Sequence, residues 1–106
     1  MTKNREEFQL KLAAETARIG WSELERYFAK GVLWQVDAEQ DLIEVAVEMA
    51  MNNEQQIKQW MNEGIIAELD IATAKDWQKN DPDLWAVVMA PWVLVQLDTG
   101  KKRTNA

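Results

Sequence analysis

The chain has 106 residues and a formal net charge of −6 at pH 7, with 47% hydrophobic residues, six tryptophans, no histidine and no cysteine. This length and composition are typical of one globular domain rather than of a disordered chain. Without histidine or cysteine, the chain has no disulfide, no thiolate metal site and no catalytic triad of the usual form. We therefore expect a protein that is not an enzyme and that carries no cofactor.

The negative charge is concentrated in the middle of the chain. Nine carboxylates and one base, Lys58, lie between Gly31 and Ala74, whereas a short basic run, residues 101–103, stands near the C-terminus. A surface of this sign repels phosphate groups, so nucleic acid is not the partner that we expect. No apolar run follows the charged N-terminal residues, and the longest one in the chain is shorter than the roughly 20 residues of a membrane-spanning helix. We expect a cytoplasmic protein without a membrane partner.

Two helices and a strand are predicted in the first third of the chain. Residues 5–18 repeat apolar side chains at helical spacing, which indicates an amphipathic helix. A second helix is predicted over 22–30, with Ser22 as its N-cap and Gly31 as the left-handed residue that ends it. Residues 32–36 then form a short strand.

Residues 42–51 are apolar almost throughout, and their pattern fits a helix or a strand. Glu44 and Glu48 are four residues apart, as on one face of a helix, but residues 43–49 also alternate as a strand does. We interpret the segment as a helix because Asp41 is placed to cap it. The strand remains the alternative.

Two further helices and a strand follow this segment. Asn53 is predicted to cap a helix over 54–63, after which residues 65–69 form a strand. Asp70 caps a short helix that ends at Lys79.

The most apolar stretch of the chain, residues 85–97, contains one polar side chain, Gln96. Its β-branched and aromatic content favours one long strand, and because both faces are apolar we expect cover on both sides. Pro91 cannot donate a backbone hydrogen bond, so the ladder must break, bend or lie at an edge there. We place a single domain at 1–97 and a flexible polar tail at 98–106.

The order of these elements resembles that of a winged helix. It predicts an α+β fold in which a helix-turn-helix packs on a small three-stranded antiparallel sheet. In that arrangement residues 54–63 form the recognition helix, and its amide side chains are suited to adenine edges: Gln55, Gln56, Gln59 and Asn62. Lys58 is the only base on this helix, which carries two acids, so its affinity for phosphates is low.

Three stretches of sequence form a distinctive combination: Leu24–Asp37, the pattern Ile57-x-x-Trp60-x-x-x-Gly64, and the run Trp85-Ala-Val-Val-x-Ala-Pro-Trp-Val-Leu-Val-Gln96. Together they resemble a family of small bacterial proteins known as domain of unknown function 2288. The resemblance covers most of the chain. It implies a bacterial cytosolic protein and supplies no activity, cofactor or catalytic residue.

An acidic loop is the one candidate for a metal site. Asp37, Glu39 and Asp41 alternate, and Glu48 follows eleven residues after the first of them, which is the oxygen-ligand spacing of a calcium loop. The sixth position of such a loop requires glycine and is Leu42 here. The alternative is an acidic turn whose last residue caps a helix, and we expect no metal.

The tryptophans are the candidate partner-binding residues. Trp34, Trp85 and Trp92 lie in or near predicted strands, and six tryptophans exceed what so small a core obviously needs. We therefore expect a protein–protein interaction module that binds a protein partner or itself, since two-fold dimers dominate soluble oligomers. Three alternatives stay open: all six tryptophans form core, the helix over 54–63 binds DNA, or tryptophans line a pocket for a small ligand.

Overall fold

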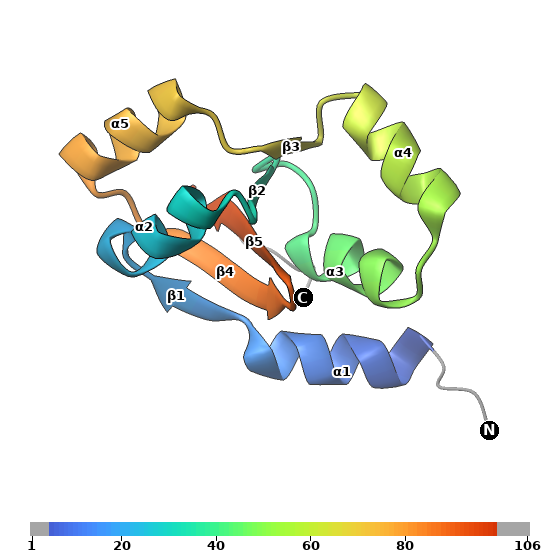
Figure 1. The fold of residues 1–106 in the computed structure, drawn as a ribbon. Coiled ribbons are helices and arrows are strands. Elements are labelled where there is room, and N and C mark those ends of the chain that lie inside the picture. Colours follow the sequence, from blue (N-terminus) through green and yellow to red (C-terminus); the bar gives the residue numbers. More distant parts are fainter. Residues whose placement is uncertain (1–4, 100–106) are drawn as a thin grey trace.

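A computed structural model describes residues 5–99, and these form five helices and five strands (Figure 1). Within these residues, no helix combines the length and the apolarity that crossing a membrane requires. The elements in chain order are α1 (Arg5–Glu15), β1 (Ala17–Ile19), α2 (Trp21–Lys30), β2 (Leu33–Val36), α3 (Leu42–Ala50), α4 (Glu54–Asn62), β3 (Ile66–Glu68), α5 (Ile71–Asn80), β4 (Leu84–Met89) and β5 (Trp92–Leu97).

The strands form one mixed sheet in the order β1-β4-β5-β2-β3. β5 and β2 are parallel, and the other three neighbouring pairs are antiparallel. The α+β class is confirmed, but the expected three-stranded antiparallel sheet is wrong, and the winged-helix resemblance is not confirmed. The main difference from the predicted sheet is the parallel pair at its centre. This pair places β5, the last strand, beside β2, which is the first strand that the sequence predicts.

Residues 85–97 belong to a hairpin and not to one strand. β4 and β5 are antiparallel, with Met89 opposite Trp92, and the Ala90–Pro91 peptide bond in the turn between them is cis. The predicted break of the ladder at Pro91 is therefore confirmed, whereas the single long strand is wrong. A proline marks an interruption of a strand but does not say whether the chain continues or reverses.

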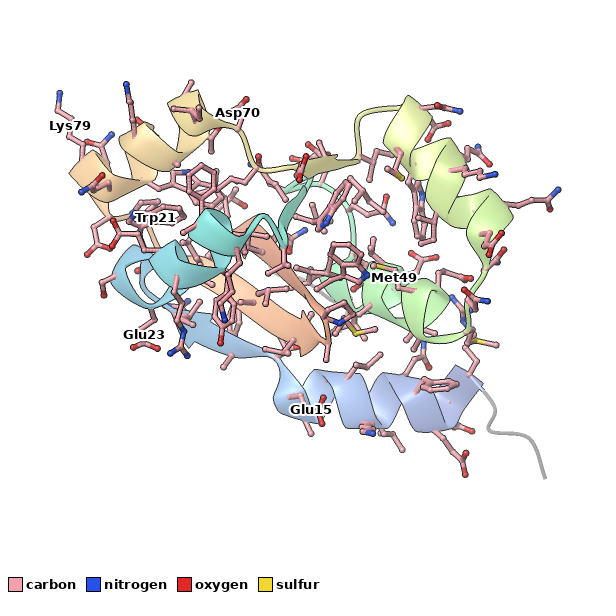
Figure 2. All side chains as sticks on the ribbon, in the orientation of Figure 1. Glu15, Trp21, Glu23, Met49, Asp70 and Lys79 are labelled. Atoms are coloured by element: carbon pink, nitrogen blue, oxygen red, sulfur yellow. The ribbon has the colours of Figure 1, made fainter. Side chains whose placement is uncertain are left out.

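Helices cover both faces of the sheet, as the two-sided apolarity of residues 85–97 predicted. On one face α1, α3 and α4 pack on a core that includes Leu12, Val87 and Leu94. On the other face α2 and α5 enclose a core that includes Trp21 and Trp77, whose ring centroids are 6.0 Å apart. Figure 2 shows Trp21 in this second layer.

The local signals for three helices are confirmed. Residues 42–51 contain helix α3, whose N-cap Asp41 accepts hydrogen bonds from the backbone N–H of Ile43 at 2.9 Å and of Glu44 at 3.4 Å. Asn53 caps α4, and Asp70 caps α5 with an acceptor 2.7 Å from the backbone nitrogen of Thr73.

The predicted N-cap of α2, Ser22, is wrong. α2 begins at Trp21, its N-cap is Gly20, and no side chain caps it, so Ser22 is an exposed residue of the first turn. Its end agrees with the prediction, because Gly31 has φ 77° in the left-handed region.

The first helix is shorter than predicted, because residues 17–19 form the edge strand β1. Ala17 to Ile19 pair with Ala86 to Leu84 of β4. Of the tail predicted over 98–106, residues 100–106 lie outside the described residues. Asp98 is fixed by a backbone hydrogen bond to Asp83 at 2.9 Å and by an ion pair with Arg18.

Candidate interaction groove

A groove of about 640 Å³ lies where α1, the turn from α3 to α4, the first turns of α4 and the β4–β5 turn meet. Glu15 on α1 and Met49 on α3, which Figure 2 labels, both line it. Its apolar lining comes mainly from Phe8, Leu12, Met49, Ile57, Met89 and Trp92. The groove therefore collects side chains from segments that are far apart in the sequence.

The apolar side of the groove continues onto the exposed tip of the β4–β5 hairpin. Val88 is 54% exposed and Trp92 is 38% exposed, although Val87 and Val93 beside them are buried. α2 and α5 cover the part of the hairpin near Leu84, and their core does not include Val88. The tip thus presents apolar side chains to solvent next to an open groove.

Four charged side chains form the rim of the groove. Lys11 and Glu15 come from α1, and Glu54 and Lys58 come from α4. All four are exposed, and within residues 5–99 none of them takes part in a salt bridge. The rim therefore has no net charge, although the protein as a whole carries −6.

An ion pair joins α1 to the last turn of α3, which leads into the turn at one end of the groove. Nη1 of Arg5 is 2.7 Å from Oε2 of Glu48, which is largely buried on α3. Asn53 donates a hydrogen bond from Nδ2 to Oε1 of the same carboxylate at 2.8 Å. The bond from Asn53 lowers the pKa of Glu48 below its ordinary value, with a further contribution from Arg5, although burial acts in the opposite direction.

The structure brings two of the three candidate tryptophans together. The rings of Trp34 and Trp92 meet edge to face, with centroids 6.0 Å apart and planes at 87°, but of these two only Trp92 lines the groove. Trp85 lies apart from them on β4, where the guanidinium of Arg18 sits 5.1 Å from its ring centroid. Partner binding by Trp34, Trp85 and Trp92 stays a prediction, and Trp92 has the most suitable position for it. The other three tryptophans, Trp21, Trp60 and Trp77, are buried.

The acidic loop has the geometry of a turn that caps a helix. Asp41 uses its carboxylate as the N-cap of α3, and Asp37 accepts a hydrogen bond from the backbone of Glu39 at 3.3 Å. In the part of the chain that the structure describes, no group of three or more acidic side chains is placed to hold a metal ion.

The helix considered for DNA binding lies at one end of the molecule (Figure 1). On α4 Gln55 and Gln59 are exposed, and Gln59 donates a hydrogen bond to Glu63 at 3.2 Å. Lys58, the one base of this helix, lines the groove.

Sequence reasoning missed most of the groove. Lys11, Glu15 and Val88 were not singled out, because their significance depends on which segments meet at the hairpin tip. The one available signal was the proline in the apolar run, which marked an interruption next to Trp92.

A family model and a solved structure both match the chain. A family model described as "Protein of unknown function (DUF2288)" matches residues 7–97. The solution structure of PA1075 from Pseudomonas aeruginosa, determined by NMR, is similar to the chain, with 40% sequence identity and a TM-score of 0.76 over 100% of this chain and 96% of that one. No protein with a curated description matches.

Proposed function

The chain belongs to the DUF2288 family, and from this premise we propose that it is a protein–protein interaction module that associates with a second copy through the groove. The observation that carries the proposal is the exposed apolar tip beside the groove. Val88 and Trp92 both line the groove, with 54% and 38% of their surface exposed, and they come from opposite faces of the hairpin because Val88 pairs with Val93 and Trp92 with Met89. Apolar surface that is continuous with a groove is typical of interaction sites, whereas single exposed apolar residues are ordinary.

Charge supports a second copy as the partner. Two chains of −6 repel each other at long range, and they repel least where the surface is locally neutral. The groove is such a place, because two bases and two acids surround its apolar lining. Two-fold dimers are also the commonest form of soluble oligomer.

The test compares two substitutions that change the net charge equally. Val88→Glu places a carboxylate at the hairpin tip, and Ile71→Glu places one on α5, where Ile71 is 67% exposed and does not line the groove. Sedimentation equilibrium over a wide concentration range should give a dimer for the wild type and for the Ile71→Glu variant, and a monomer for the Val88→Glu variant. A wild type that stays monomeric at every concentration overturns the proposal.

The same protein serves to test the DNA-binding alternative. Fluorescence anisotropy with a labelled duplex at low salt should show no binding, since α4 offers one base against two acids along residues 54–63. Binding that weakens steeply with salt and is lost in Lys58→Glu would support a DNA-binding protein instead.

A further inference from the structure

The four rim charges form two pairs, one on each helix, and the order of acid and base along the chain is reversed between the two helices. On α1 the base Lys11 precedes the acid Glu15 by four residues, and on α4 the acid Glu54 precedes the base Lys58 by four residues. Residues at this spacing lie one turn apart on the same side of a helix. Each wall of the groove therefore presents one positive and one negative group, and no salt bridge within residues 5–99 uses them.

We infer that these four charges select a second copy of this chain, with the acids of one groove facing the bases of the other. The inference rests on the proposed function and adds the determinant of specificity. In a two-fold interface, if one residue contacts a second residue of the partner, the second contacts the first in turn. A wall with one acid and one base can satisfy that condition when it lies antiparallel to a matching wall, because Lys11 then faces Glu15 of the other copy at both ends.

A partner of uniform charge does not fit this rim. An acidic surface would meet Glu15 and Glu54, and a basic surface would meet Lys11 and Lys58. Like charges that face each other in an interface are strongly unfavourable, whereas exposed opposite charges add little affinity. The rim therefore acts mainly by excluding wrong partners, and the apolar tip supplies the affinity.

Charge sorting tests the inference. In the variant Lys11→Glu/Lys58→Glu all four rim groups are acidic, and in Glu15→Lys/Glu54→Lys all four are basic. Each variant alone should dimerise roughly tenfold more weakly than the wild type, or worse, because like charges face each other. An equimolar mixture of the two should form a heterodimer, and this recovery should weaken at high salt.

A variant with all four substitutions is the matched control. It has the composition and net charge of the wild type, and it exchanges acid for base at each of the four positions. Its walls remain complementary to each other, so it should dimerise as the wild type does. All four residues are exposed, and circular dichroism and thermal unfolding will show that each variant is folded.

The outcomes separate the two proposals. If the wild type dimerises and both sorted variants dimerise equally well, charge selection is wrong and the interaction module stands. If the sorted variants lose dimerisation but their mixture does not restore it, charge pairing is again overturned. If the wild type is a monomer, both proposals fail.

Discussion

Gln96 fastens the acidic loop to the centre of the sheet. It is 1% exposed, and its Nε2 donates to the backbone carbonyl of Asp37 at 2.8 Å and to that of Gln40. Because the side chain joins β5 to the segment that leads into α3, it sets the start of the helix that packs over this face. We predict that Gln96→Leu destabilises the fold although leucine has a similar size and is apolar.

The expected loss follows from the two carbonyls. A typical hydrogen bond contributes about 0.5–1.5 kcal/mol net, and a buried acceptor left without a donor costs about 1–3 kcal/mol. Because the loop is partly open to solvent, water can partly hydrate the two carbonyls that lose their donor. We therefore expect a decrease of about 2–3 kcal/mol in the free energy of unfolding. For a domain of this size, such a change lowers Tm by about 10–20 °C.

Thermal and urea unfolding followed by circular dichroism will measure this change. The matched control is Gln78→Leu, because Gln78 is exposed on α5 and should tolerate the same substitution with little effect. A Gln96→Leu variant as stable as the control would show that the two carbonyls are fully satisfied by water and that the loop is not held by this side chain.

The remaining predictions concern the ion pair of Glu48, the turn at Gly31 and the cap at Asp41. The pKa of Glu48 is lowered in the folded protein, so its charged form contributes stability that is present above the ordinary value of 4.5 and is lost as pH falls through the folded pKa. The stability difference between the wild type and Glu48→Gln in urea should therefore shrink on going from neutral pH to strongly acidic pH, and a constant difference would contradict the reasoning. Gly31→Ala should lower the free energy of unfolding, measured in urea, by about 1 kcal/mol, because the φ of 77° is unfavourable for alanine although nothing lies within 4 Å of the added Cβ. An unchanged midpoint would show that the turn relaxes. Asp41→Ala should lower the free energy of unfolding by about 1 kcal/mol through loss of the cap. Asp41→Asn should largely avoid this loss, since an asparagine side chain also accepts hydrogen bonds from the backbone. Equal losses in both variants would indicate a role for the charge.

Signals that act within a few residues predicted much of the helical structure. Asp41, Asn53 and Asp70 cap helices where expected, because an N-cap is a contact between neighbours in the chain. The same reasoning placed the apolar faces of residues 85–97 and the interruption at Pro91 correctly.

Such local signals do not predict how the strands pair in the sheet. Ala17 to Ile19 show no alternation of their own and form a strand because β4 lies beside them. The reversal after Met89, and the parallel pairing of β5 with β2, depend on contacts between distant segments.

In the candidate site too, local signals predict some features, and contacts between distant segments determine the others. Trp92 was identified because aromatic residues stand out in a sequence, but its contact with Trp34 requires the parallel pairing of β2 and β5. The exposure of Val88 follows from where the covering helices lie, and no pattern around Val88 indicates it.

The position of β5 has a consequence for how the protein is made. β5 lies third in the sheet, between β4 and β2, although it is the last strand along the chain. Without residues 92–97, β2 and β3 form one pair of strands and β1 and β4 form another, and no strand of the sheet joins the two pairs. Closing the sheet then requires a contact between segments about sixty residues apart, which is slow to form compared with local structure. Before β5 is inserted, the chain should therefore carry preformed helices and exposed apolar strands, and this interval is when it would most depend on chaperones.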